Sequence, residues 1–239
     1  MVETDGRAVA GGLAVLSLLL LAGCLQIGVH STVAGDGTIS EYRMQINVSR
    51  TAYGFLTQSA KDQGYDSVKA YLLADVRGGQ SPDNETLLAG VNRSDVGNVS
   101  YRETFHGDRV SMEITMEDVR PPAGGALSVT ERDGTLVYED RTFVNESSAN
   151  ATTGELDRQV AAGFAVDYYL TMPGKITDTN ADVVDGNTAE WHATGADAFT
   201  NTSIHAESEK PASAPLDGFG VVVALVALLV APVVIRRRR

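Results

Sequence analysis

The stretch EYRMQINVSRTAYGFLTQSA, residues 41–60, changes its apolar spacing halfway along. Over residues 42–48 apolar and polar side chains alternate, which is the pattern of a strand with one buried face. Over residues 51–76 the apolar side chains recur at helical spacing, interrupted at Gly64. The sequence therefore predicts a strand that leads directly into two helices or one broken helix.

Strand patterns lie on both sides of this stretch. Residues 29–34 and the turn at 35–37 predict a hairpin with residues 42–48. After a polar loop at 78–95, further strands are predicted at 99–105, 110–116, 127–130, 135–144, 164–172, 176–191 and 203–207. A polar, Thr-, Ser- and Asn-rich loop at 145–157 separates them. The predicted fold class is α+β, an antiparallel β-sheet with a helical segment packed on it.

The start of the chain has the layout of a secretory signal. Residues 8–22 are apolar and follow Arg7, and small residues precede Cys24, the one cysteine in the sequence. Residues 21–24, Leu-Ala-Gly-Cys, resemble the lipobox of bacterial-type lipoproteins. This resemblance implies a signal peptide over residues 1–23 and lipidation of Cys24. The alternative is an ordinary signal peptide with an incidental cysteine.

The end of the chain has the layout of a membrane anchor. Residues 218–235 carry no charge and four arginines follow at 236–239, so we predict a transmembrane helix and a cytoplasmic basic tail. Residues 208–217 are predicted to be a linker. The tail also resembles the PGF-CTERM sorting signal of archaeal surface proteins, although Asp217 stands at the proline position before Gly218. A plain C-terminal anchor is the alternative.

The charge balance and the sequons suit an exported protein in a salty medium. The formal net charge is −12, which excludes nucleic acid as a partner and resembles the acidic surfaces of haloarchaeal proteins. Asn-x-Ser/Thr sequons predict a glycoprotein. The glycosylation candidates are Asn47, Asn84, Asn92, Asn98, Asn145, Asn150 and Asn201.

No spacing in the sequence indicates catalysis or a cofactor. The histidines are His30, His106, His192 and His205. None has metal-ligand spacing, so a zinc site would have to be assembled by the fold alone. The residues from Asp178 to Asp182 resemble the opening of a calcium loop but lack its later glycine and glutamate, although Asp182 and Asp185 remain candidates for a weak surface cation. We therefore predict no catalytic residue, no metal site, no cofactor and no enzyme activity.

The stretch MPGKITDTNADVVDGNTAEWHATG, residues 172–195, combines a Pro-Gly turn, an Asp-Gly-Asn turn at 185–187 and Trp191. It resembles the signature of the LppM-like lipoprotein family. The resemblance covers the lipobox, an early Gly-Asp-Gly hairpin, a helical segment and an apolar C-terminal helix. It implies an extracytoplasmic α+β domain over residues 24–207, of a family proposed to bind lipids or glycolipids. From the residues alone, Trp191 is expected in the core.

The expected function is that of a non-catalytic lipoprotein at the cell membrane. Its domain faces outside, anchored by lipidated Cys24 and the C-terminal helix, with membrane lipids as its surroundings. A lipid or glycolipid is expected in a groove between the helical segment and the sheet, and a filled core there is the alternative. The competing function is an envelope-organising or protein-interaction protein without a small ligand, its protein partners unknown.

Overall fold

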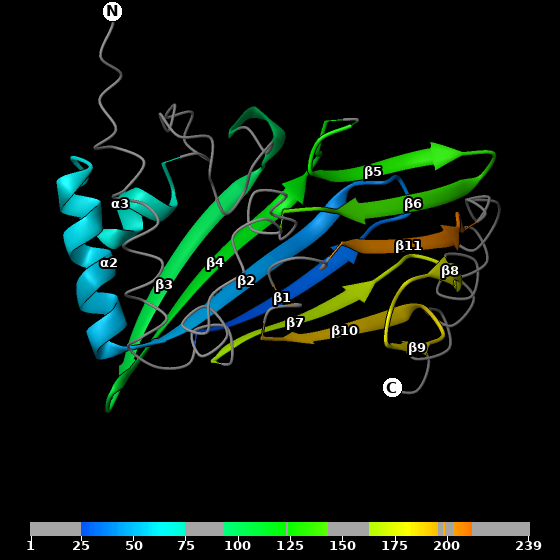
Figure 1. Cartoon of the computed structure of the whole chain (residues 1–239). Coiled ribbons are helices and arrows are strands. Elements are labelled where there is room, and N and C mark those ends of the chain that lie inside the picture. The colour runs from blue at the N-terminus through cyan, green and yellow to red at the C-terminus, as the bar shows by residue number, and fades with distance from the viewer. Residues whose placement is uncertain are drawn as a thin grey trace, which may run out of the picture.

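The computed structural model describes residues 25–74, 93–122, 124–142, 163–195, 198 and 203–211. Over these residues the fold consists mostly of β-sheet with few helices (Figure 1). A large sheet has the strand order β3-β4-β2-β1-β7-β10-β9, and a small sheet has the order β5-β6-β11-β8. The elements are β1 Leu25–Val33, β2 Ile39–Ser49, α2 Arg50–Asp62, α3 Val68–Leu72, a 3-10 turn Arg93–Asp95, β3 Asn98–His106, β4 Arg109–Val119, β5 Leu127–Arg132, β6 Thr135–Asp140, β7 Phe164–Thr171, β8 Ile176–Thr179, β9 Val183–Asp185, β10 Thr188–Thr194 and β11 Ile204–Glu209.

The predicted passage from strand to helices is confirmed. β2 ends at Ser49, whose hydroxyl accepts a hydrogen bond from the amide of Ala52 at 3.1 Å and so caps the first turn of α2. After α2 the backbone of Gly64 has a φ of +84°, a conformation that favours glycine and ends the helix. Ser67 then caps α3 in the same way. Two short helices result.

The prediction of a wholly antiparallel sheet is wrong at one pairing. β1 and β7 run parallel, from Leu25 opposite Phe164 to Thr32 opposite Thr171. Strands that pair in parallel cannot be joined by a tight turn, and here the whole chain from β2 to β6 lies between them. The alternation of apolar residues indicates which face of a strand is buried, but it does not indicate whether the neighbouring strand is parallel or antiparallel. The parallel pairing of β1 with β7 was therefore not predictable from the sequence pattern.

The segment predicted as strands over 176–191 is divided between the two sheets. β8 pairs with β11 in the small sheet, whereas β9 and β10 pair in the large one around the predicted turn at 185–187. At the crossing, Gly174 lies so close to the backbone carbonyl of Glu209 that a side chain would collide with it. β11 also extends to Glu209, because Ser208 is fully buried and pairs with β6. It therefore takes in the first two residues of the predicted linker.

One face of the large sheet is covered and forms the core. Helices α2 and α3 cover one end of this inner face and the small sheet covers the other (Figure 1). On the helical side, the hydroxyl of Tyr53 donates to Glu103 at 2.8 Å and its ring meets Phe105 edge to face. On the side of the small sheet, Trp191 is 6% exposed, which confirms its place in the core.

Several predicted segments lie outside the described residues. These are the signal peptide at 1–23, Cys24, the loop at 145–157, the linker residues 212–217, the transmembrane helix at 218–235 and the tail at 236–239. They stay predictions. In the part of the chain that the structure describes, no helix is both long and apolar enough to cross a membrane.

Candidate functional site

The outer face of the large sheet is polar, because alternate residues of each strand point away from the core. Strand register lines these side chains up in rows across the sheet. In one row Arg102 of β3 lies opposite Glu113 of β4, which lies opposite Gln45 of β2. In the next, Thr104 lies opposite Ser111. Polar groups far apart in the sequence are therefore neighbours on this face.

These rows border a hollow of about 360 Å³ over β2, β3 and β4. Its basic groups are Arg102, Arg109 and His106, and its hydrogen-bonding groups include the amides of Gln45 and Asn47. Among the described residues neither arginine forms an ion pair. A guanidinium presents several donors in one plane and binds carboxylate or phosphate oxygens in pairs. The hollow thus offers unpaired cationic donors beside neutral ones and the single carboxylate of Glu113, in a chain whose net charge is −12.

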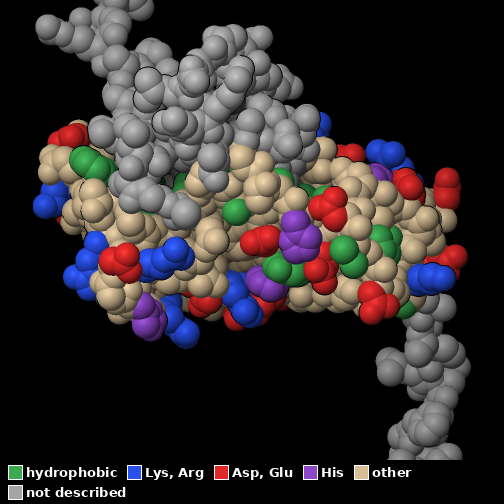
Figure 2. Space-filling model, turned by 60° about the horizontal axis from the view of Figure 1, so that its bottom comes forward, with side chains coloured by type: hydrophobic (Ala, Val, Ile, Leu, Met, Phe, Trp, Pro, Cys, Tyr) green, Lys and Arg blue, Asp and Glu red, His purple; other side chains and the backbone are tan. Residues whose placement is uncertain are grey.

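A second group of side chains lies over β1, β7 and β10 on the same face. The rings of His30 and Tyr169 stack at 4.6 Å. His192 uses both ring nitrogens: Nδ1 lies 2.8 Å from a carboxylate oxygen of Asp167, and Nε2 lies 3.4 Å from one of Glu190. Hydrogen bonding to Asp167, supported by Glu190, raises the pKa of His192 above 6.5. Figure 2 shows histidine among acidic side chains in the middle of this face, and basic side chains toward its left end.

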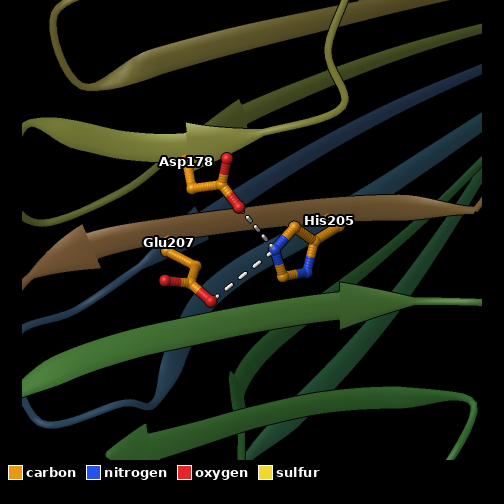
Figure 3. Close-up of side chains that lie close together, drawn as sticks. All are labelled: Asp178, His205 and Glu207. Atoms are coloured by element: carbon orange, nitrogen blue, oxygen red, sulfur yellow. Dashed lines mark ion pairs between the residues drawn. The ribbon is translucent and has the colours of Figure 1, made fainter. Parts of the chain in front are cut away.

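A third group lies on the small sheet, where the fold brings together residues that the sequence keeps apart. Asp178 of β8 is the direct cross-strand partner of Glu207 of β11, and His205 is two residues before Glu207 on the same side (Figure 3). Nε2 of His205 lies 3.7 Å from a carboxylate oxygen of Asp178 and 3.7 Å from one of Glu207. One nitrogen therefore faces both carboxylates.

The contact between the two sheets contains a buried polar network. Asp140 of β6 is fully buried, and one of its carboxylate oxygens accepts hydrogen bonds from the hydroxyls of Tyr42 at 3.0 Å and Tyr168 at 2.8 Å. The other oxygen accepts from the amide of Thr142 at 2.9 Å. The hydroxyl of Tyr138 contacts that of Tyr168. Burial raises the pKa of Asp140, and the network fixes how the small sheet sits on the large one.

The described sequon residues have different surroundings. Asn47 lines the hollow, half-buried, and accepts a hydrogen bond from Gln45 at 3.3 Å. Asn98 is exposed on β3 and donates to Glu117 at 3.2 Å. Asn84, Asn92, Asn145, Asn150 and Asn201 lie outside the described residues, like Cys24.

The two candidates for a weak surface cation are not brought together as ligands. A carboxylate oxygen of Asp182 accepts a hydrogen bond from the amide of His192 at 2.7 Å. Asp185 ends β9 and its backbone carbonyl accepts from the hydroxyl of Thr188 at 2.9 Å. Asp182 therefore has a structural role in the described fold, since it ties the β8–β9 connection to β10.

Sequence reasoning missed the hollow, the cluster around His205 and the buried Asp140. For the hollow a signal was present, because Arg109, Ser111 and Glu113 alternate with the buried residues of β4. For His205 the decisive fact is the pairing of β8 with β11, which no local pattern encodes. Asp140 is the last residue of the strand sequence TLVYED, and a carboxylate at the end of a strand is typical of an exposed turn.

Comparison with known proteins gives a family but no activity. No family model matches the chain. A protein of Archaeoglobus fulgidus, described only as uncharacterized, is 38% identical over 220 residues, which cover 92% of this chain and 90% of that protein. The chain belongs to the same family as that archaeal protein.

Among solved structures, the folded domain of LppM from Mycobacterium tuberculosis resembles this chain weakly. Its TM-score is 0.41 at 13% identity, and the likeness covers 79% of this chain and 91% of that domain. The resemblance of this chain to the LppM-like family stays a prediction. The resemblance of the tail to a PGF-CTERM signal stays a prediction.

Proposed function

We propose that the protein is a non-catalytic, membrane-anchored lipoprotein whose extracytoplasmic domain binds the polar head group of a lipid or glycolipid. The observation that carries the proposal is the hollow on the outer face of the large sheet. Arg102 and Arg109 supply cationic donors there, and Gln45 and Asn47 supply amides that both donate and accept. This combination suits an anionic head group that carries hydroxyls, such as a phosphorylated sugar.

The hollow also suits a head group better than an acyl chain. Its walls are charged or hydrogen-bonding side chains, whereas acyl chains bind in apolar pockets. The described residues between helices and sheet, including Ala52, Val68 and Leu72, are buried in the core. The apolar groove predicted at that place stays a prediction. In our proposal the acyl chains remain in the bilayer, to which Cys24 and residues 218–235 hold the domain.

The proposal is tested by titrating the full chain, purified in detergent and high salt, with water-soluble glucose 1-phosphate by calorimetry. Glucose and inorganic phosphate are titrated separately, because glucose carries only the hydroxyls and inorganic phosphate only the anionic group of the proposed ligand. We expect the sugar phosphate to bind more tightly than either. Replacing Arg102 and Arg109 by glutamine should weaken binding about tenfold or more, since a hydrogen bond to a charged group contributes about 1.5–3 kcal/mol.

Arg132→Gln is the matched control, because Arg132 is an exposed arginine on β5 of the small sheet. It should leave binding unchanged. Equal binding by the wild type and the double glutamine variant would place any head-group site elsewhere and defeat the proposal.

The competing function, a protein-interaction surface without a small ligand, has one observation in its favour. β9 is an edge strand of the large sheet, and its Val183 and Val184 are 49% and 45% exposed. Exposed apolar residues on a sheet edge are suited to pairing with another chain. Substituting both valines by lysine should weaken such pairing, because charged side chains protect a sheet edge, and should leave head-group binding intact.

A further inference from the structure

We propose that Asp178, His205 and Glu207 form a surface binding site for a divalent transition-metal ion, with Zn²⁺ as the ion that fits best. The site lies on the small sheet and is independent of the head-group hollow on the large one. One histidine nitrogen and two carboxylates are a donor set that zinc accepts. The two negative charges also balance a divalent ion.

The first argument is the direction of the imidazole. Nε2 of His205 faces both carboxylates at 3.7 Å, which is too long for a direct hydrogen bond to either one. The candidate ligand atoms all lie within 4.8 Å of one another. The nearest point that is equally distant from all three therefore lies roughly 2.0–2.4 Å from each, which spans the bond lengths of zinc to nitrogen and oxygen.

The second argument is a comparison within the molecule. His192 also lies between two carboxylates, but Nδ1 contacts Asp167 and Nε2 contacts Glu190. The two nitrogens point away from each other across the ring, so no single ion can contact both carboxylates and the imidazole. That arrangement suits a protonated imidazole that donates twice. In the cluster around His205 the same three groups converge on one point (Figure 3).

The third argument is that the scaffold already holds the ligands in place. The backbone of His205 is fixed on both sides: its amide donates to the side chain of Asn180 at 3.0 Å, and its carbonyl accepts from the hydroxyl of Thr179 at 2.6 Å. Asn180 also accepts the indole N–H of the buried Trp191 at 2.9 Å. β11 itself lies between β6 and β8. Rigid strands with bonded partners place ligands more reproducibly than loops do.

The side chains leave part of the coordination sphere open to solvent. Their exposed fractions are 71% for Asp178, 31% for His205 and 35% for Glu207. Three protein ligands and at least one exchangeable position are the arrangement of zinc sites that accept an outside ligand. The site therefore has room for water or for a donor group of a partner molecule.

The test is a calorimetric titration with Zn²⁺ of the full chain, purified in detergent and stripped with a chelator. We expect one ion per chain. His205→Ala and Glu207→Gln should each weaken binding by at least tenfold, while His192→Ala, the matched control, should leave it unchanged. Because all three ligands are partly exposed, the variants should unfold within a few degrees of the wild type, which separates a lost ligand from a lost fold.

A second readout identifies the ligand directly. Co²⁺ in place of Zn²⁺ should give visible absorption bands of a low-coordinate ion, and His205→Ala should remove them. The proposal is overturned if wild type and His205→Ala bind Zn²⁺ equally, or if His192→Ala is the variant that loses the ion. Neither result would bear on head-group binding at the hollow.

Discussion

Asp140→Ala should destabilise the protein strongly, because this carboxylate is the acceptor of the network between the two sheets. The substitution removes the acceptor from the hydroxyls of Tyr42 and Tyr168 and from the amide of Thr142. Tyr168 keeps Tyr138 as a partner, so the loss falls mainly on Tyr42 and Thr142. A buried donor left without an acceptor costs about 1–3 kcal/mol. We expect a loss of about 2–5 kcal/mol in the free energy of unfolding.

Thermal and denaturant unfolding of the full chain, in detergent and high salt, measures this loss. Trp191 is the one tryptophan in the sequence, and its ring lies 5.8 Å from that of Tyr168, so its fluorescence reports on the network. The expected change is a decrease in melting temperature of about 5–15 °C. The exposed Asp66→Ala serves as the control and should change the stability by less than about 0.5 kcal/mol. A loss below about 1 kcal/mol for Asp140→Ala would refute the reasoning.

The pH dependence supplies an independent check on Asp140. Burial raises its pKa above 3.8 in the folded state, so the folded protein holds this proton to a higher pH than the unfolded chain. The associated stability is complete below pH 3.8 and is lost as the pH rises through the folded pKa. Asp140→Asn carries no such proton. The stability of the wild type relative to this variant should therefore fall from acid to neutral pH, and a constant difference would contradict a raised pKa.

Four further predictions concern separate parts of the chain. Cys24→Ser should abolish incorporation of a labelled lipid precursor in the host, and equal labelling would remove the lipobox interpretation. A tag placed after Arg239 should survive protease added to intact cells, because the arginines keep that end inside. In NMR titrations His192 should show a pKa above 6.5 that falls on Asp167→Asn; stability from this charge is present below pH 6.5 and lost as the pH rises through the folded pKa. Gly174→Ala should destabilise by about 1–3 kcal/mol in denaturant unfolding, because its side chain meets the carbonyl of Glu209.

Much of the local structure was predictable because each signal acts within a few residues. Alternation in 42–48 and 110–116 predicted which residues of β2 and β4 are buried, and the change to helical spacing at residue 51 predicted the start of α2. The glycine at Gly64 set its end. These features depend on the period of apolar residues in an element or on the residues at its ends, and both can be recognised from residues close together in the sequence.

The arrangement of the elements was less predictable because it depends on partners distant in sequence. β1 pairs with β7 although the chain from β2 to β6 lies between them in sequence. β8 pairs with β11 in the small sheet, although β7 and β9 on either side of it belong to the large sheet. The cluster around His205 follows from the second pairing, because His205 reaches Asp178 through the register of β11 on β8. The hollow depends instead on the register of β2, β3 and β4, which places Arg102 opposite Glu113. A sequence pattern gives the face of a strand but not its neighbour.

The most direct test of the proposed function is native mass spectrometry of the full chain purified from its own host in mild detergent. We predict one non-covalent lipid per chain, distinct from the modification of Cys24 because it dissociates on collisional activation. Fragmentation should show an anionic, hydroxyl-rich head group. The variant with Arg102→Gln and Arg109→Gln should lack this lipid, whereas Arg132→Gln should retain it. A wild-type chain that carries no lipid, or a double variant that retains it fully, would contradict head-group binding at the hollow.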